Sequence, residues 1–366
     1  MLANVASVEK LDATEVDDRR AVSDAVTRVL IAMDKFRGTA SASELCDTIA
    51  DAVAEAGVTG DVQPMSDGGE GFVDAFSGDV VDVDVPGPLG QTVSARVKLV
   101  ASPAGLTAVF EVSDVVGRDL LPSPSGEDAL RASSEGVGHV ILAAARFGAD
   151  LVLVGCGGTV TSDGGLGCYR VLSDHGGLPL PVTVATDVTA QFLEARNYAS
   201  QKGVPDSELH TIDQRLRSAH ALYLEERGVD VVHLERSGAA GGIPGALAAL
   251  GAQLTSGVDV VAASVDLVHR AAVASLVITG EGRFDEGSLE GKVVFGVARA
   301  VTATLPLLVV CGSIEESAAR RFRHEFVNAT LVSLEERFGL PRALGDVRSC
   351  ISQVIRDELR DAAPQR

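Results

Sequence analysis

The segment at residues 155–165 reads GCGGTVTSDGG and follows the apolar run LVLV, which is typical of a buried strand. Backbone N–H groups of a glycine loop that leads into a helix can bind phosphate without any named motif. Gly157, Gly158 and Thr159 are therefore candidate phosphate contacts, and Asp163 is a candidate ligand for Mg²⁺, directly or through water. The alternative is that the glycines only allow tight turns and that Asp163 caps the next helix.

Neither standard fingerprint for phosphate binding is present. The segment from Gly287 to Val293 is nearest to the P-loop pattern, but it has one residue too few between its glycines and a valine in place of Ser or Thr. In the dinucleotide pattern G-x-G-x-x-G, Val160 stands where the third glycine is needed. An ordinary P-loop enzyme and an NAD enzyme are both disfavoured, whereas phosphoryl transfer by another arrangement stays open.

Two further segments, DKFRG at residues 34–38 and DGGEG at residues 67–71, place charge after predicted strands. A guanidinium suits a carboxylate or a phosphate, and acids next to glycines can accept hydrogen bonds from substrate hydroxyls. The candidate substrate contacts are Asp34, Arg37, Asp67, Gly68, Gly69 and Glu70. The alternatives are a solvated loop for the first segment and a helix N-terminus with favourably placed acids for the second.

Asp187 and the segment at residues 281–292 complete the set of charged positions. Asp187 is a candidate general base, because phosphoryl transfer to an alcohol needs a carboxylate that orients the hydroxyl and accepts its proton. Glu281 is a candidate Mg²⁺ ligand, and Lys292 could neutralise charge on the transferred group. The alternatives are a helix cap for Asp187 and a surface loop with local ion pairs for the segment.

The elements that must position these residues follow an α/β order. Strands are expected at 28–33, 62–65, 151–154, 181–185, 276–279, 307–311 and 330–334. Helices are expected at 43–56, 128–147, 205–227, 292–303 and 345–360. Two more helices are expected, one that follows the glycine loop and ends at about residue 173, and one that begins at residue 238. The alternating segments 80–85, 93–100 and 106–112 are expected to be antiparallel strands instead. Ligands bind at the carboxyl ends of strands in open α/β sheets, so the charged positions could converge there.

Composition limits the class of protein. The chain has 366 residues, a length that suits two domains better than one. Of these residues 46% are hydrophobic and none is Trp, so the cores must be mainly aliphatic. Its net charge of −20 opposes binding to nucleic acid or to anionic membranes. The cysteines form no C-x-x-C pair, and no apolar run reaches the ~20 residues that span a bilayer. We expect a cytoplasmic protein with reduced thiols and a flexible extension at residues 1–27, which lack the apolar core of a signal peptide.

Taken together, the motifs resemble the bacterial glycerate kinase family of the first type, which makes 2-phosphoglycerate. The matching segments occur in the family's order and are IAMDKFRGTASASE (31–44), PMSDGGEGFVDAF (64–76), GCGGTVTSDGGLG (155–167), GAAGGIPGAL (238–247) and LVITGEGRFDEGSLEGKVVFGVAR (276–299). The resemblance implies a two-domain α/β enzyme. A Rossmann-like parallel-sheet domain at 28–75 and 275–366 would carry an inserted mixed α/β domain at 76–274, with the active site in the cleft between them.

The resemblance also implies a kinase that uses ATP and Mg²⁺ to phosphorylate the 2-hydroxyl of D-glycerate. The expected catalytic residues are Asp187, Lys292 and Arg37, and the expected metal ligands are Asp163 and Glu281. The expected ATP contacts are Gly157, Gly158, Thr159, Gly164, Gly165 and Gly282.

Several positions depart from the family pattern. Lys35 replaces the usual serine, Ser162 replaces the usual asparagine, and the Asn-Pro-Leu expected after Asp187 is missing from a shortened segment at residues 189–200. Because these changes fall mainly in the predicted inserted domain, two alternatives stay open. One is a kinase for another small hydroxy acid or sugar acid, and the other is a non-catalytic ligand-binding relative. A homodimer also stays open.

Overall fold

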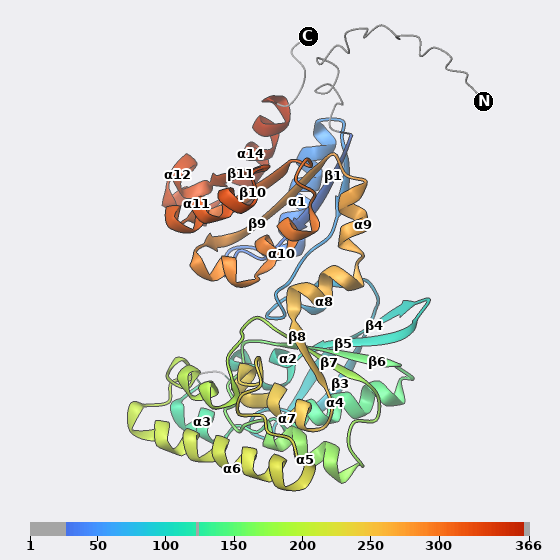
Figure 1. Ribbon diagram of the computed structural model, residues 1–366, viewed down its shortest axis with the longest axis vertical. Helices are drawn as coiled ribbons and strands as arrows, with labels where there is room; N and C mark the ends of the chain where they lie inside the picture. The colour runs from blue at the N-terminus through green and yellow to red at the C-terminus, as the bar shows by residue number, and fades with distance from the viewer. Residues whose placement is uncertain (1–26, 122–123, 362–366) are drawn as a thin grey trace, which may run out of the picture.

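The computed structural model describes residues 27–121 and 124–361, whose strands form two separate sheets (Figure 1). The five-stranded sheet is built from the two ends of the described chain, and the six-stranded sheet comes from its middle. In Figure 1 the blue and orange-red elements of the first sheet lie above the green and yellow elements that surround the second. The molecule is therefore elongated, with two α/β bodies stacked end to end.

The five-stranded sheet has the order β11-β10-β9-β1-β2, and all its neighbouring strands are parallel. Its strands are β1 (Arg28–Met33), β2 (Thr59–Val62), β9 (Leu276–Phe284), β10 (Leu307–Ile314) and β11 (Ala329–Ser333). The helices of this body are α1 (Ala42–Glu55), α10 (Val293–Ala300), α11 (Glu316–Glu325), α12 (Leu334–Phe338), α13 (Leu340–Gly345) and α14 (Val347–Asp361). β1 is apolar along its length because helices cover both faces of a parallel sheet.

The six-stranded sheet has the order β3-β4-β5-β6-β7-β8 and is antiparallel from β3 to β5 and parallel from β5 to β8. Its strands are β3 (Asp79–Pro86), β4 (Thr92–Ser102), β5 (Gly105–Glu111), β6 (Leu151–Cys156), β7 (Val182–Thr186) and β8 (Gln253–Ser256). Its helices are α2 (Ser113–Val116), α3 (Gly126–Arg131), α4 (Glu135–Arg146), α5 (Leu166–Asp174), α6 (Leu209–Arg227) and α7 (Ile243–Ala249). Short 3₁₀ turns, including η3 (Phe192–Tyr198) and η4 (Ser200–Lys202), connect them.

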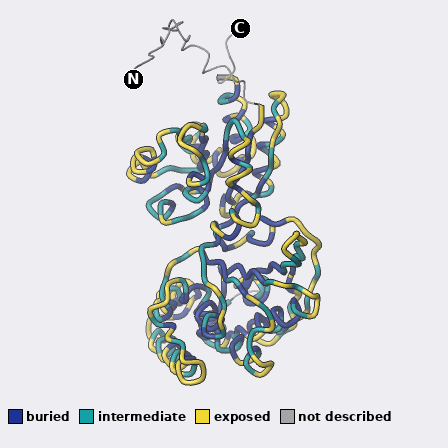
Figure 2. The backbone as a smooth tube through the Cα atoms, turned by 45° about the vertical axis from the view of Figure 1, so that its right-hand side comes forward, coloured by how far each residue is buried: buried dark blue, intermediate teal, exposed yellow. Residues whose placement is uncertain are grey.

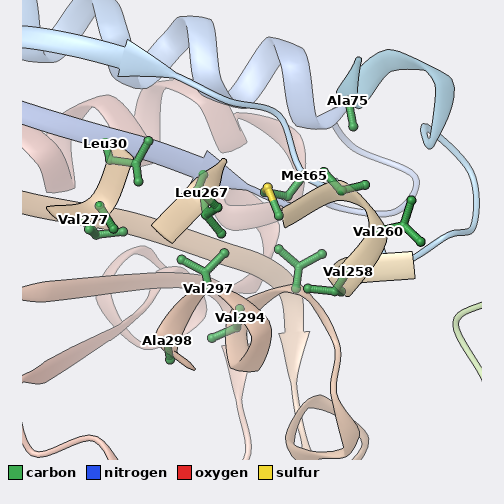
Figure 3. Packing of buried hydrophobic residues seen from close by; sticks show 14 of the residues in the cluster. Leu30, Met65, Ala75, Val258, Val260, Leu267, Val277, Val294, Val297 and Ala298 are labelled. Atoms are coloured by element: carbon green, nitrogen blue, oxygen red, sulfur yellow. The ribbon is translucent and has the colours of Figure 1, made fainter. Parts of the chain in front are cut away.

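Two short helices, α8 (Gly257–Ser264) and α9 (Leu267–Ala272), lead the chain from β8 back to β9. Figure 3 shows Val258 of α8 and Leu267 of α9 packed beside Val277 of β9 and Val294 of α10. The same buried cluster includes Leu153 of the six-stranded sheet. Apolar packing therefore continues from one sheet to the other, and Figure 2 shows exposed backbone mainly at the periphery of both bodies.

Several elements differ from the sequence-based prediction, and helices α2, α8, α9, α11, α12 and α13 were not predicted. The helix expected at 128–147 is broken into α3 and α4, and Ser134 between them donates two hydrogen bonds to Asp163. The strand expected at 62–65 is β2, which already ends at Val62. β9 runs on to Phe284 because it pairs with β10 along its extended length, and β8 was not predicted.

The predicted fold class is confirmed: the chain is α/β, with a parallel sheet and a second, mixed sheet whose strands are inserted between β2 and β9. The predicted domain boundaries, 28–75 with 275–366 and 76–274, stay a prediction. The flexible extension predicted at 1–27 lies outside the described residues, apart from Thr27.

Candidate active site

A cavity of about 520 Å³ lies where loops of the two sheets meet. Its wall comes from the loop after β1, from β9 and the turn after it, from the end of β10, from α13, and from the loops that follow β6 and β7. Most of these segments follow the carboxyl ends of parallel strands, which is where open α/β sheets bind ligands. The charged side chains in the wall are Asp34, Lys35, Arg37, Asp67, Glu70, Asp187, Glu281, Arg283, Asp285, Lys292 and Glu335.

A second cavity of about 1050 Å³ adjoins the first. The two share the lining residues Lys35, Phe36, Arg37, Thr39, Glu70, Gly157, Gly158 and Asp187. The second cavity adds three cations, Arg96, Arg118 and Lys202, and the side chain of Tyr198. It also adds five acids, Glu44, Asp74, Glu111, Asp114 and Asp119, and Arg96 is ion-paired with Asp74 and Asp114. The cation that lines both cavities with a guanidinium group is Arg37.

The loop after β1 is hydrogen-bonded to β9. The backbone N–H of Asp34 donates to the carbonyl oxygen of Gly280 at 3.0 Å, and Lys35 Nζ lies 3.9 Å from Asp34 Oδ1 and 3.7 Å from Asp67 Oδ1. Burial alone would lower the pKa of Lys35, but the charges of Asp67 and Asp34 outweigh it and raise the pKa. Lys35 is therefore a permanent positive charge between two acids.

The loop at residues 66–71 lies between β7 and α8, and its backbone is in close contact with the backbone of both elements. Gly68 has φ +97°, and a Cβ there would lie 2.9 Å from the carbonyl carbon of Ala185. A Cβ on Gly257 of α8 would lie 2.1 Å from the carbonyl oxygen of Asp67. Glycine is thus required on both sides of this loop.

The same packing brings three charged segments together at Gly69. A Cβ built on Gly69 would lie 3.2 Å from Asp67 Oδ1, 3.8 Å from Lys35 Nζ and 3.9 Å from Asp187 Oδ2. The loop after β1, the loop at residues 66–71 and the loop after β7 therefore place one cation and two carboxylates around a single point.

Two acids of the first cavity, Asp34 and Asp187, hold their protons more tightly than free carboxylic acids because their pKa values are raised. Burial, followed by the charge of Asp67, raises the pKa of Asp34 to about 7 and that of Asp187 to about 6. Asp34 is buried, whereas Asp187 lies among many protein atoms on the cavity wall and is still reached by water from the cavity, so its shift in pKa is the smaller of the two. Asp187 is thus a carboxylate placed to take up a proton near neutral pH.

Glu281 is the most deeply buried acid of the cavity wall and carries an unpaired oxygen. Burial raises its pKa to about 8, and its Oε1 is one of two buried side-chain atoms in the described residues that lack a hydrogen-bond partner. A buried polar atom without a partner is costly, so Glu281 is well suited to bind a cation supplied from outside the chain.

The glycine loop after β6 divides into an exposed half and an interior half. Gly157 and Gly158 line both cavities, and Thr159 lines the second. The carboxylate of Asp163 instead accepts four hydrogen bonds, from the backbone N–H groups of Ser134, Gly165 and Gly167 and from the hydroxyl of Ser134. Asp163 lines neither cavity, and its contacts are those of a carboxylate that joins α4 to α5.

Lys202 supports the interior half of this loop. Its buried ammonium group donates to the carbonyl oxygen of Thr161 at 2.5 Å, to Ser162 Oγ at 3.2 Å and to Thr159 Oγ1 at 3.4 Å. Burial lowers the pKa of Lys202 to about 8. Ser162, which stands where an asparagine was expected, therefore accepts a hydrogen bond from a buried lysine.

The structure brings most of the predicted site residues to the cavity walls. The predicted residues that line at least one cavity are Asp34, Arg37, Asp67, Gly69, Glu70, Gly157, Gly158, Thr159, Asp187, Glu281, Gly282 and Lys292. Gly68 and Asp163 pack behind the walls. Gly164 and Gly165 also lie away from both cavities, because they pack against the side chains of Ala219 and Ala246.

Several residues of the walls were not predicted as site residues. Lys35 and Lys202 could have been found from composition, since only five of the 31 basic residues are lysine and both lie inside polar motifs. Tyr198 and the apolar side chains of α13 carry no local signal, because their segments resemble any amphipathic surface turn.

Comparisons with known proteins show the family to which the chain belongs. The family model described as "Glycerate kinase family" matches residues 29–175 and 179–361. This chain belongs to the glycerate kinase family. It is 32% identical over 340 residues to the glycerate 2-kinase of Escherichia coli, a match that covers 81% of this chain and 88% of that protein.

Two further members of the glycerate kinase family extend the comparison. The glycerate kinase of Bacillus subtilis is 30% identical over 338 residues, which cover 81% of this chain and 88% of that protein. A crystal structure of a proposed glycerate kinase 2 from Salmonella typhimurium LT2 superposes with a TM-score of 0.74 at 26% identity, covering 92% of this chain and 98% of that one. The resemblance seen in the sequence motifs is therefore confirmed over nearly the whole described chain.

Membership of the glycerate kinase family implies a kinase that acts on a small molecule and uses a nucleotide. Within the part of the chain that the structure describes, no helix is long and apolar enough to cross a bilayer. The predicted cytoplasmic location and the homodimer stay predictions.

Proposed function

We propose that the protein is an ATP-dependent kinase that phosphorylates the 2-hydroxyl of D-glycerate to give 2-phosphoglycerate. The observation that carries the proposal is the convergence of Asp187, Asp67 and Lys35 around Gly69, beside Gly157 and Lys292 at one cavity. Kinases need this set, because their catalysis consists of positioning the acceptor hydroxyl and stabilising negative charge on the transferred group. The names of the E. coli and B. subtilis relatives favour glycerate as the acceptor.

The acceptor would lie between the two cavities. Arg37, which lines both, would hold the carboxylate of glycerate with its guanidinium group, and Asp67 and Glu70 would accept hydrogen bonds from hydroxyls. The 2-hydroxyl oxygen would then attack the γ-phosphorus while the bond from that phosphorus to the β–γ bridging oxygen breaks. Asp187 would take the hydroxyl proton, and ADP would leave.

One cation and a set of backbone N–H donors would stabilise the phosphates. Lys292, at the N-cap of α10, would contact the γ-phosphate, and the backbone N–H groups of Gly157 and Gly158 would contact its neighbours. Thr159 and Gly282 stay in the proposed nucleotide contacts because each lines a cavity wall. Gly164 and Gly165 are left out because they pack against helices elsewhere.

The residues present fit a magnesium ion. Glu281 has a buried side-chain oxygen, Oε1, without a hydrogen-bond partner. Asp34 lies beside it, because the backbone N–H of Asp34 donates a hydrogen bond to the carbonyl oxygen of Gly280. Among the described residues no three His, Cys, Asp or Glu side chains form a ready-made metal site, which agrees with Mg²⁺, since this ion uses one or two carboxylates together with phosphate oxygens and water. Glu281 and Asp34 would therefore hold Mg²⁺, which would neutralise phosphate charge. Asp163 is not included because its carboxylate is fully hydrogen-bonded.

The test is a coupled assay for ADP in which D-glycerate and Mg²⁺ are each omitted in turn, followed by phosphorus NMR of the product. ADP release that needs both, with phosphate on the 2-oxygen, is the expected result. Release without glycerate dependence would reject the acceptor, and phosphate on the 3-oxygen would reject the position of transfer. No ADP release under any condition would favour a non-catalytic relative.

A second candidate acceptor is another small hydroxy acid or sugar acid. The observation that favours it is Tyr198, which ends the altered segment η3 and lines the large second cavity. A longer acceptor could fill more of this cavity than glycerate does. Comparing kcat/KM over a panel of hydroxy acids and sugar acids decides between them, and a clear preference for D-glycerate would exclude this candidate.

A further inference from the structure

Helix α13 presents two large apolar side chains on the wall of the first cavity. Leu340 is 49% exposed and Leu344 is 57% exposed, and both line the cavity together with the buried Ala343. Exposed leucines are ordinary when they are scattered, but these two lie one helical turn apart on the wall of a cavity that already holds the candidate catalytic groups.

This apolar surface shares the cavity with a charged cluster. Lys35, Asp67 and Asp187 gather around Gly69, whereas α13 supplies Leu340, Ala343 and Leu344 to the same wall. Gly312 of β10 and Gly282 of β9 also line the cavity and contribute backbone without side chains. The wall of one cavity thus combines charged side chains from the strand-end loops with apolar side chains from α13.

We propose that Leu340 and Leu344 hold the purine base of the nucleotide. The inference rests on the proposed kinase function, because it assigns the phosphates to the charged residues of the cavity wall and the base to the apolar side chains of α13. A flat heteroaromatic ring would cover both leucine side chains, and burial of that apolar surface favours binding. Ser313 and Glu335, which line the same cavity, supply polar groups for the ring edge.

The arrangement also separates the two substrates. With the nucleotide lying along the first cavity, the acceptor is left the region of Arg37, which lines both cavities, and the space of the adjoining second cavity. A small hydroxy acid carries no apolar face that would match α13. The reverse arrangement, with the acceptor against α13, would place the nucleotide base in the second cavity and is the main competing outcome.

The test uses the double variant Leu340→Ser with Leu344→Ser in the full chain. Both side chains are about half exposed, so their replacement should leave the fold intact. We expect the KM for ATP and the dissociation constant for ADP to rise about tenfold, which corresponds to ~1.4 kcal/mol, while kcat and the KM for glycerate stay unchanged. Magnesium tripolyphosphate, which has phosphates and no base, should inhibit the variant as strongly as the wild type.

The matched control is Leu224→Ser on α6, since Leu224 is 46% exposed and lines neither cavity. It should change none of these constants. A double variant with an unchanged KM for ATP, a raised KM for glycerate, or an equal loss of tripolyphosphate affinity would overturn the base site. If the wild type fails to phosphorylate glycerate, the ADP and tripolyphosphate titrations still test the base site by themselves, so the two failures are distinguishable.

Discussion

Asp187 is the residue on which the proposed chemistry depends most directly. Asp187→Asn keeps the size of the side chain and its place beside Gly69, but an amide cannot accept the hydroxyl proton. We expect kcat to fall roughly 10²- to 10⁴-fold, with the KM for glycerate changed only slightly. Steady-state kinetics at saturating ATP and Mg²⁺ measure this, and a variant with full turnover and the same KM would reject Asp187 as the base.

The pH dependence of the reaction follows from the same residue. The carboxylate must be ionised to accept a proton, and burial together with Asp67 raises its pKa to about 6. The value of kcat/KM should therefore be level above about pH 7 and fall as the pH drops through about 6. A pH–rate profile measures this limb, and a profile that stays level down to pH 5 would contradict it.

Glu281 is the residue whose replacement should act through the metal. In the absence of a cation its pKa is raised to about 8, so at neutral pH Glu281→Gln resembles the protonated side chain and should not unfold the protein. The Mg²⁺ concentration that gives half-maximal activity should rise roughly 10- to 100-fold, the range seen even when groups that only orient ligands are changed. Magnesium titrations of activity measure this, and an unchanged midpoint with an unchanged melting temperature would reject Glu281 as a ligand.

Lys202 links the glycine loop to the pH dependence of stability. Its folded pKa, about 8, lies below the ordinary 10.5, so between these values the unfolded chain binds more protons than the folded chain. The contribution of Lys202 to stability therefore grows as the pH rises from 8 towards 10. From pH 7.5 to 9.5 the free energy of unfolding of the wild type should rise by roughly 1–2 kcal/mol relative to Lys202→Met. Denaturant unfolding at both pH values measures this, and parallel curves would contradict the buried charge.

At the scale of elements, the loop at residues 66–71 offers a matched pair of glycines. Gly68 and Gly71 both have positive φ, but a Cβ at Gly68 would meet the backbone of Ala185 at 2.9 Å, whereas a Cβ at Gly71 would meet nothing within 4 Å. Gly71→Ala should cost about 1 kcal/mol of stability, because only the left-handed backbone is strained. Gly68→Ala should cost roughly 1–3 kcal/mol more, because the loop must also move off β7.

The loop movement should also appear in activity. Displacement of Asp67 from Asp187 and Lys35 should lower kcat/KM in Gly68→Ala far more than in Gly71→Ala. Thermal unfolding and steady-state kinetics on both variants separate the two effects. Equal losses in the two variants would mean that close contact with β7 does not position the loop.

Elements that are determined by their own sequence could be predicted, whereas elements that depend on contacts with distant residues could not. β1 was predicted to the residue, because a strand covered on both faces leaves an uninterrupted apolar run, here VLIAM after the exposed Arg28. The break between α3 and α4 could not be predicted, because Ser134 is held by Asp163, a contact that spans 29 residues. The end of β9 was missed for a similar reason, since its extension depends on pairing with β10.

The same distinction explains the site. Acids that follow apolar runs were expected to converge, and Asp34, Asp67 and Asp187 do line one cavity. Asp163 has the same local pattern but turns inward to α4, since local sequence does not determine which neighbours a loop carboxylate faces. The apolar wall of α13 could not be recognised without the fold, because only the fold brings it to the cavity.

At the scale of the whole molecule, the reactivity of the five cysteine thiols measures how tightly the two bodies are packed. Cys46, Cys156, Cys168, Cys311 and Cys350 are all free and buried. Burial raises the thiol pKa of each, so few thiolates form at neutral pH. An aromatic disulfide reagent should therefore release less than about one equivalent of thiol from the native protein, and all five only in denaturant. Rapid reaction of several thiols in the native state would contradict this packing.

The position of β1 in the five-stranded sheet has a consequence for synthesis of the chain. β1 lies between β2 and β9, and the hydroxyl of Thr279 reaches back to the carbonyl oxygen of Ala32 across 247 residues. The strands of the six-stranded sheet, by contrast, are continuous between residues 79 and 256. On the ribosome the middle of the chain can therefore fold first. β1 cannot pair with β9 until β9 has been synthesised, which takes roughly 10–50 s at the usual rates of elongation. During this interval an apolar strand with an open edge is exposed, so nascent chains are expected to need a chaperone before the first strand finds its partner.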